Sequence, residues 1–166
     1  PRLPEAVEQR WTRAWGDAVV AAARRQTGRR PPLDLSFASE EAATRFGHGT
    51  PLASKHVRLF QSGAVSELPG FDEGQWWVQD LAASLPARLV PKGAREVLDL
   101  CAAPGGKTMQ LAAAGHAVTA LDSSGTRLER LSDNLRRTGL EARLELADAL
   151  ECQPDRQFDS ILLDAT

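Results

Sequence analysis

The feature that most constrains the fold of this 166-residue chain is the run VLDLCAAPGGKT at residues 97–108. Residues 97–100 suit a buried strand, the adjacent glycines Gly105 and Gly106 suit a turn, and a helix-like stretch follows. Such a strand, glycine turn and helix bind nucleotide-like ligands in α/β proteins, because no Cβ keeps the backbone from the ligand. The next strand-like run ends at Asp122, where a carboxylate can accept both hydroxyls of a ribose. We therefore expect a binding site for a nucleoside-containing cofactor.

The spacing of the glycines separates three classes of cofactor. A Walker A loop requires Gly-x-x-x-x-Gly-Lys-[Ser/Thr]; residues 106–108 fit its end, but its first glycine would fall at Cys101. The dinucleotide fingerprint Gly-x-Gly-x-x-Gly does not match either. An S-adenosylmethionine site remains, since that cofactor has no pyrophosphate for the turn to wrap. The alternative is an ordinary strand–helix turn, because short glycine motifs give false matches.

Strands and helices alternate over the second half of the chain. Strands are predicted over 96–100, 117–121, 142–146 and 160–163, and helices over 78–89, 107–114 and 126–138. Gly115 and Gly139 stand where glycines end helices. Alternation with short connections predicts an α/β fold with a parallel, doubly wound sheet and right-handed crossovers.

The first part of the chain has a different pattern. Helices are predicted over 4–15 and 17–26, a short helix between Ser39 and Gly47, and strands over 33–37, 57–60 and 64–68. These elements predict a helical lead-in and a small α+β module. We place the domain boundary after residue 72, which gives domains 1–72 and 73–166.

The composition limits the partners and the compartment. Lys+Arg 20 against Asp+Glu 22 gives a net charge of −2, so no overall basic field indicates a nucleic-acid partner. Arginines gathered at 24–30 and 127–137 can contact phosphates or form a solvated face. Two cysteines fit a reducing cytoplasm, and no signal peptide or apolar run of about 18 residues indicates secretion or a membrane span. We expect a cytoplasmic protein without a membrane partner.

Several blocks of sequence resemble, in the same order, the Sun-type 16S ribosomal RNA cytosine-5 methyltransferases of bacteria. They are GQWWVQD at 74–80, LCAAPGGKT at 100–108, ALD at 120–122, ADA at 147–149 and FDSILLDA at 158–165. The resemblance implies a Rossmann-like class I methyltransferase sheet, of which this chain holds the first four strands, after a small RRM-like module that contacts RNA. It also implies S-adenosylmethionine as the cofactor and ribosomal RNA as the substrate.

The resemblance assigns roles to individual residues. It implies a cofactor-binding stretch made of Cys101, Ala102, Ala103, Pro104, Gly105, Gly106 and Lys107. Asp122 would bind the ribose hydroxyls and Asp148 the adenine amino group, while Asp164 would be a cofactor-side or substrate-positioning acid. The alternatives are a helix cap for Asp122 and a solvated loop carboxylate for Asp148. For Asp99, inside a strand, we favour a structural role in which it braces the turn by accepting backbone N–H groups.

The chain departs from the family pattern after Asp164. Family members continue Asp-Ala-Pro-Cys-Ser, and their nucleophilic cysteine follows in a later Thr-Cys pair, whereas this chain reads Asp164-Ala165-Thr166. Methylation of cytosine at carbon 5 requires a thiolate to attack carbon 6. Cys101 and Cys152 are interpreted as ordinary thiols. We therefore expect an inactive portion of a longer enzyme, with no catalytic nucleophile. Its fourth strand has an apolar edge, so we expect the chain to be poorly soluble alone, to pair with another chain through that edge, or to fold with the missing half supplied separately.

Two other functions remain open from the sequence. A non-catalytic RNA-binding or adaptor protein would keep the fold without its chemistry. A nucleotide hydrolase would use residues 106–108 and would bind ATP or GTP with magnesium. His48, His56 and His116 have no metal-ligand spacing, so we predict no metal site.

Overall fold

The chain divides into two units, Pro1–Pro31 and Pro32–Thr166. The computed structural model describes residues 2–28, 31–60, 63–153 and 156–165. Arg29 and Arg30 of the expected basic stretch, and the final Thr166, lie outside the described residues. No helix in these described ranges is long and apolar enough to cross a membrane.

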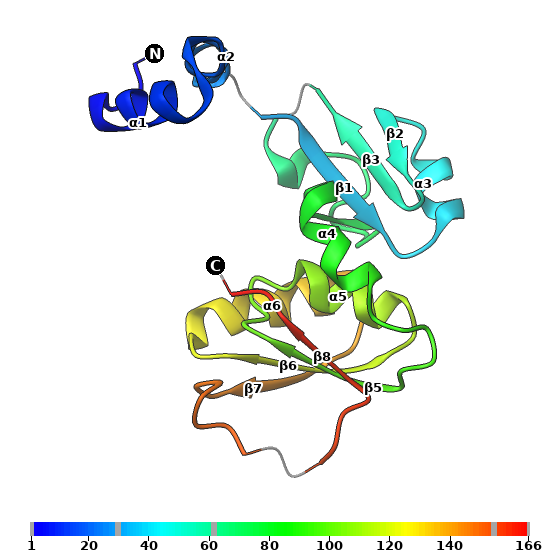
Figure 1. Ribbon diagram of the computed structural model, residues 1–166. Coiled ribbons are helices and arrows are strands. Elements are labelled where there is room, and N and C mark those ends of the chain that lie inside the picture. Colours follow the sequence, from blue (N-terminus) through cyan, green and yellow to red (C-terminus); the bar gives the residue numbers. More distant parts are fainter. Residues whose placement is uncertain (1, 29–30, 61–62, 154–155, 166) are drawn as a thin grey trace. The chain divides into compact units, whose positions relative to one another are not determined.

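The first unit is a pair of helices (Figure 1). The helix α1 (Glu5–Trp15) and the helix α2 (Asp17–Gln26) meet at Gly16, whose φ of 82° lets the chain reverse there. An ion pair between Arg24 and Glu8 joins the two helices. Both helices confirm the prediction for this region.

The second unit begins with an antiparallel sheet in the order β2-β3-β1-β4, whose strands β1, β2 and β3 are labelled in Figure 1. Its elements are β1 (Leu33–Phe37), α3 (Glu40–Phe46), β2 (Thr50–Ala53), β3 (His56–Leu59), the 3-10 helix η1 (Val65–Glu67) and β4 (Trp76–Val78). As predicted, Ser39 caps α3, its hydroxyl accepting the N–H of Ala42 at 3.1 Å, and Gly47 ends the helix in the left-handed conformation.

Two predictions for this sheet are wrong. The strand expected over 64–68 is the 3-10 turn η1, in which the N–H of Leu68 donates to the carbonyl of Val65. The sheet is instead completed by β2 and β4, which the prediction lacked. Proline is tolerated in β2 because that strand lies at the sheet edge, where Pro51 leaves no ladder bond unmade. The strand β4 lies beyond residue 72, so the expected domain boundary falls before the last strand of the first sheet.

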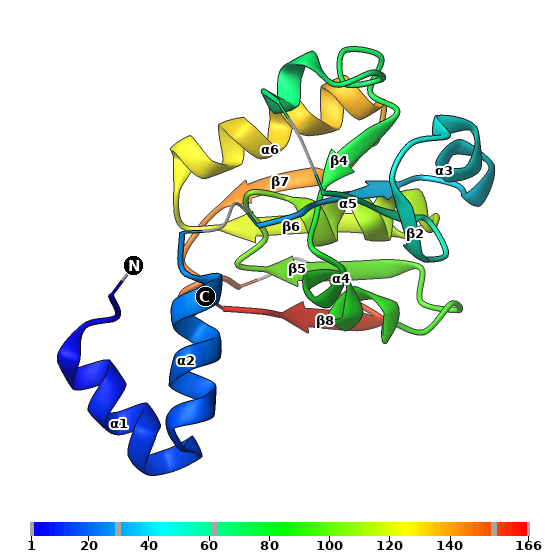
Figure 2. The same cartoon turned by 90° about the horizontal axis from the view of Figure 1, so that it is seen from above.

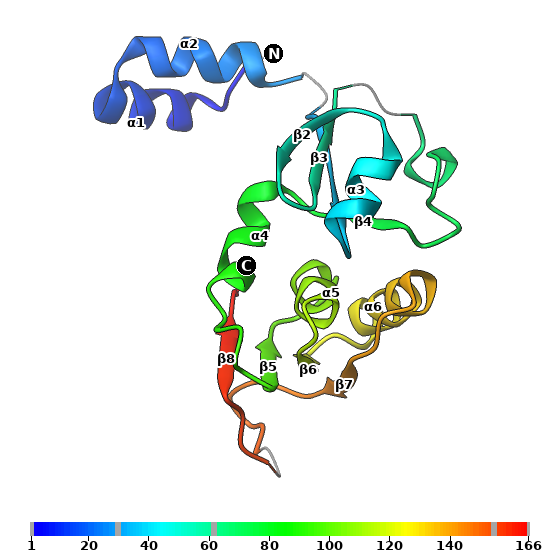
Figure 3. The same cartoon turned by 90° about the vertical axis from the view of Figure 1, so that its right-hand side faces the viewer.

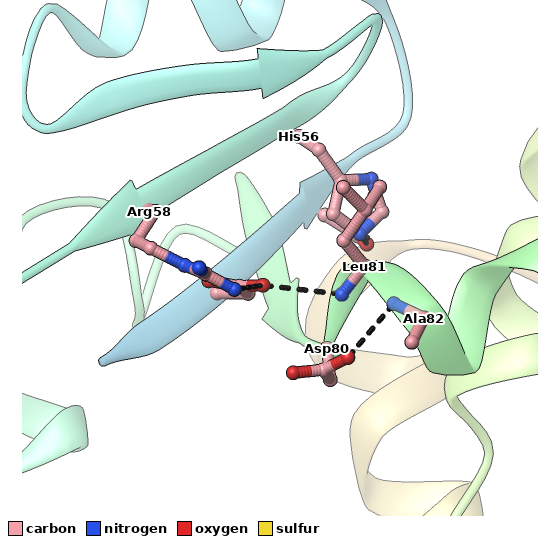
Figure 4. Close-up of polar contacts among 7 residues, drawn as sticks. His56, Arg58, Asp80, Leu81 and Ala82 are labelled. Atoms are coloured by element: carbon pink, nitrogen blue, oxygen red, sulfur yellow. Dashed lines mark hydrogen bonds and ion pairs between the residues drawn. The ribbon is translucent and has the colours of Figure 1, made fainter. Parts of the chain in front are cut away.

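The helix expected over 78–89 is shorter than predicted. It is α4 (Leu81–Arg88), whose first residues are fixed by hydrogen bonds. Asp80 caps it by accepting the N–H of Ala82 at 2.7 Å (Figure 4). The buried carboxylate of Asp34, on β1, accepts the N–H of Leu81 at 3.1 Å and two hydrogen bonds from Arg58 at 2.6 and 2.8 Å. The Arg58 guanidinium therefore holds the pKa of Asp34 below its ordinary value. The first sheet thus fixes where α4 begins.

The rest of the unit is a parallel sheet in the order β7-β6-β5-β8 (Figure 2), which confirms the predicted α/β fold with a parallel sheet. Its strands are β5 (Glu96–Leu100), β6 (Ala117–Asp122), β7 (Arg143–Leu146) and β8 (Ser160–Leu163). The helices α5 (Gly106–Ala113) and α6 (Gly125–Thr138) cover the face of this sheet that looks toward the first sheet (Figure 3). The prediction of a doubly wound sheet is not met, because α5 and α6 lie on the same face among the described residues. Ile161 and Leu163 of β8 are exposed, and the expected pairing of β8 with another chain stays a prediction.

The short strand β4 contributes to two hydrophobic cores. Successive side chains of a strand point to opposite faces. Trp76 accordingly packs in the core of the first sheet with Leu35, Phe37 and Phe46. Trp77 packs in the core beneath α5 and α6, with residues that include Met109, Leu128, Leu131 and Leu135. Two adjacent tryptophans therefore join the first sheet to the parallel sheet.

We predict that Trp77→Ala lowers the free energy of unfolding by about 3–5 kcal/mol, because it removes a fully packed indole from the shared core. Val78→Ala is the matched control, since Val78 is the next residue and is 47% exposed. Val78→Ala should lower the free energy of unfolding by only about 0.5 kcal/mol. Urea unfolding of both variants measures the difference, and equal losses would contradict the role given to Trp77.

Candidate cofactor-binding site

The turn between β5 and α5 is bound to the end of the neighbouring strand β6. Cys101 has a left-handed φ of 59°, and the peptide bond between Ala103 and Pro104 is cis. The N–H of Ala102 donates to the carbonyl of Leu121 at 3.0 Å, and the N–H of Ala103 donates to Asp122 Oδ2 at 3.1 Å. The predicted turn and the predicted ribose-binding acid are therefore brought together.

The fold requires glycine at only one of the two adjacent glycine positions of the turn. Gly105 has φ 107°, and a Cβ there would lie 2.1 Å from the Leu131 Cδ1 atom of α6. Both its conformation and its close approach to α6 require glycine. Gly106 has neither constraint, because a Cβ there would lie at least 3.4 Å from its nearest neighbour, Gln79. The fold therefore needs Gly105 but does not explain Gly106.

Asp122 is buried at the carboxyl end of β6 and holds several donors. Its Oδ2 accepts the N–H of Ala103, and its Oδ1 accepts the N–H of Ser124 at 2.9 Å. The cap of α6 is Ser124, whose hydroxyl accepts the N–H of Arg127 at 3.4 Å. The Asp122 carboxylate therefore braces the turn, and each of its oxygens retains acceptor capacity for a further donor.

Arg127 is a site residue that the sequence interpretation missed. It donates to the carbonyl of Ala103 and lies 3.5 Å from Asp122 Oδ2. One signal could have found it: a cation in the first turn of a helix opposes the helix dipole and needs a partner. Arg127 lines a cavity of about 220 Å³ with Cys101, Asp122, Asp148 and Ala149, among others.

Asp148 reaches this cavity through the loop that follows β7. The N–H of Ala147 donates to the carbonyl of Asp122 at 3.2 Å, which holds the loop beside the end of β6. The Asp148 side chain is exposed, and its Oδ1 accepts the N–H of Leu150 at 2.9 Å. The structure therefore places Asp148 and Asp122 on one cavity, together with Cys101.

Lys107 and Asp164 form the second group of predicted site residues. Lys107 Nζ lies 2.6 Å from Asp164 Oδ2, so the first turn of α5 is tied to the end of β8. This pair accounts for a cation at a helix N-terminus, a position that the dipole disfavours. Both side chains are partly exposed, at 20% and 35%, and remain accessible to a ligand.

Asp99 braces the turn, but not in the expected way. Its carboxylate accepts the hydroxyl of Thr108 at 2.6 Å, rather than a backbone N–H, and is 1% exposed. Burial raises the pKa of Asp99 to about 6, although the Thr108 hydrogen bond and the charge of Lys107 oppose this shift. Asp99 therefore connects β5 to the start of α5 as a carboxyl group that titrates near neutral pH.

A parallel sheet with a glycine turn after β5 and a carboxylate ending β6 defines a Rossmann-like nucleoside-binding domain of the methyltransferase class. The model of the family described as 16S rRNA methyltransferase RsmB/F matches residues 86–166. Ribosomal RNA small subunit methyltransferase B of Erwinia tasmaniensis is 37% identical over 98% of this chain and 41% of its own length. The same enzyme of Klebsiella pneumoniae is 35% identical, with 98% and 41% covered.

The chain belongs to the RsmB/F family of 16S rRNA methyltransferases, and it spans about two fifths of the length of these relatives. Because this is a family of methyltransferases, S-adenosylmethionine is confirmed as the cofactor.

Solved structures with the same fold cover nearly all of this chain. NSun6 from Pyrococcus horikoshii, solved with SFG, has a TM-score of 0.79 at 17% identity and covers 98% of this chain and 70% of its own. A methyltransferase homolog from Pyrococcus horikoshii has a TM-score of 0.68 at 24% identity, covering 89% and 54%. At these identities the similarity establishes the fold alone.

We expect Asp99→Asn to remove a pH-dependent loss of stability. Folding raises the pKa of Asp99 from 3.8 to about 6. This carboxyl group therefore contributes most to the stability of the folded state below pH 3.8, and the contribution is lost as the pH rises through about 6. The free energy of unfolding of the Asn variant, relative to the unmodified protein, should therefore rise by about 3 kcal/mol between pH 4 and 8. Denaturant unfolding across this range measures it, and a constant difference would contradict the raised pKa.

Alanine substitutions should separate the two glycines. Gly105→Ala combines a disfavoured φ with a clash against Leu131, and we expect it to cost more than about 2 kcal/mol. Gly106→Ala should change the free energy of unfolding by less than about 1 kcal/mol, because the position is helical and has room for a Cβ. Thermal unfolding compares them, and similar losses in both variants would refute the distinction.

Proposed function

We propose that this chain carries the methyl-donor part of an enzyme that methylates carbon 5 of a cytosine in ribosomal RNA. The observation that carries the proposal is the cavity where the glycine turn, the end of β6 and the loop after β7 meet. Membership of the RsmB/F family supports ribosomal RNA as the substrate. The choice of cytosine carbon 5 rests on the sequence resemblance.

The residues of the cavity fit the parts of the cofactor. Asp122 has acceptor capacity left on both oxygens, which suits the two hydroxyls of a ribose. Asp148 offers an exposed carboxylate on the same cavity, which suits the adenine amino group. The stretch from Cys101 to Lys107, with Gly106 free of structural demands, would hold the methionine part. When bound, S-adenosylmethionine supplies an electrophilic methyl group.

Asp164 is proposed to orient the target base. Its carboxylate is tied to Lys107 at 2.6 Å and partly exposed, so it can accept a hydrogen bond from the cytosine amino group. The reaction also requires a thiolate at carbon 6 of the base. We assign this role to neither Cys101, which lines the cofactor cavity, nor Cys152, whose N–H donates to the carbonyl of Asp148. The chain alone is proposed to bind the donor without transferring the methyl group.

The first sheet is proposed as an RRM-like module that contacts the RNA in an unusual way. Its strand order β2-β3-β1-β4 and its helix after β1 agree with that fold. RRM modules stack bases on an open sheet face. Here the face opposite α3 carries buried Asp34, Ser36 and His56, which leaves no surface for stacking. Contact through the edge strand β2 and the exposed Arg45 of α3 fits the structure better.

Calorimetric titration with S-adenosylhomocysteine tests the donor site. We expect saturable binding that Asp148→Ala weakens about tenfold, the loss of one hydrogen bond to a charged group. Asp122→Asn, which keeps the size of the side chain but can accept only one of the two backbone hydrogen bonds that Asp122 accepts, should weaken it at least as much. Asp133→Ala is the control, because that carboxylate is 69% exposed on α6 and pairs only locally with Arg136 among the described residues. A folded protein that shows no binding would favour the adaptor function instead.

A further inference from the structure

Gln79 lies at the junction between the two sheets and belongs to no site described so far. It follows β4 directly and is 5% exposed. Its backbone N–H donates to the carbonyl of Asp34 at 3.1 Å, so the residue is fixed to β1 of the first sheet. Its side chain points to the same side as Trp77, toward the helices of the parallel sheet.

The amide of Gln79 connects the first sheet to α5. Its Oε1 accepts hydrogen bonds from the Ser36 hydroxyl at 2.9 Å and from the Trp77 indole at 3.0 Å. Its Nε2 donates to Gln110 Oε1 of α5 at 2.9 Å, and Gln110 in turn donates to the carbonyl of Ser84 in α4 at 3.0 Å. An indole N–H can only donate, so the orientation of the Gln79 amide is fixed.

The other end of this hydrogen-bonded chain is also fixed in direction. Arg88 Nη2, which can only donate, lies 3.3 Å from Nδ1 of His56. His56 must therefore carry its proton on Nε2, which lies 2.9 Å from the Ser36 hydroxyl and donates to it. The hydroxyl of Ser36 is then available to donate to Gln79. Burial and the charge of Arg88 lower the pKa of His56, which keeps the ring in this neutral form.

The side chain of Gln79 also lies beside the first residue of α5. Its Cγ, Cδ and Nε2 atoms lie 3.4, 3.5 and 3.6 Å from the position of a Cβ built on Gly106. Gly106 and Gln110 are four residues apart and share one face of the helix. The side chain of Gln79 therefore holds α5 through one hydrogen bond, to Gln110, and lies beside Gly106, next to the cofactor turn of residues 101–107.

We infer that Gln79 is a positioning residue for the cofactor turn: from the first sheet, it fixes the first turn of α5 and with it the backbone of residues 105–107. The inference rests on the proposed function of this turn. Binding groups must be held within a fraction of an ångström, and locked supporting side chains provide this precision. The role also explains why a glutamine is buried between two sheets that hydrophobic packing alone could join.

Gln79→Met is the informative variant, because methionine keeps the length of the side chain and removes the amide. Binding of S-adenosylhomocysteine should weaken about tenfold. Val57→Ala is the control, since Val57 is buried in the first-sheet core among residues that do not include α5. It should leave the affinity within twofold of the unmodified protein. Gln110→Met should reproduce the loss, and the double variant should be no weaker than Gln79→Met, as expected for one shared interaction.

A second measurement does not depend on the cofactor. The first hydrogen bond of α5 runs from the N–H of Met109 to the carbonyl of Gly105 at 2.8 Å. Hydrogen exchange at Met109 should become at least tenfold faster in Gln79→Met and stay unchanged in Val57→Ala. Unchanged exchange, or equal effects of both variants on affinity, would overturn the inference. If the unmodified protein binds no S-adenosylhomocysteine but the exchange result holds, the proposed function fails and the positioning role stands.

Discussion

The alternation of side chains along β4 is the constraint on which the second unit depends. A strand must direct neighbouring side chains to opposite faces. Trp76 therefore fills the core of the first sheet, and Trp77 fills the core under α5 and α6. Gln79, two residues after Trp77, continues on the same side and reaches α5. One short segment thus links the position of the first sheet to that of the cofactor turn.

This linkage determines what the first sheet can do. Its second face is polar but buried, and buried polar groups are tolerated only when they are hydrogen-bonded. Asp34 is held by Arg58 and Leu81, while Ser36 and His56 share a directed chain with Gln79. Such an interface accepts few alternative arrangements, because any shift leaves donors unpaired. The polar face of the first sheet is therefore used to hold α4 and α5 in place.

The sequence predicted the parts of the structure that depend on local pattern. The strands β5 and β6 and the helix α6 carry clear periodicity, and the glycine turn marks the cofactor edge. The strands β2 and β4 were not predicted, because Pro51 argues against a strand in β2 and the three residues of β4 show too little alternation. The pairing of Lys107 with Asp164 joins elements far apart in sequence, and only the parallel order of β5 and β8 brings them together. Arg127, by contrast, could have been found from its place in the first turn of α6, where a cation needs a partner.

The charges of the site also follow from the way these elements meet. The site holds Asp99, Asp122, Asp148 and Asp164 against Lys107 and Arg127, which gives a formal charge of −2 when all are ionised. Both cations stand in the first turn of a helix, where the helix dipole also favours anions. Each paired carboxylate is therefore stabilised by a cation and by a helix dipole. Asp99 has only a hydroxyl partner, and burial raises its pKa to about 6. The site therefore combines two carboxylates held in ion pairs with one buried carboxyl group whose charge changes with pH.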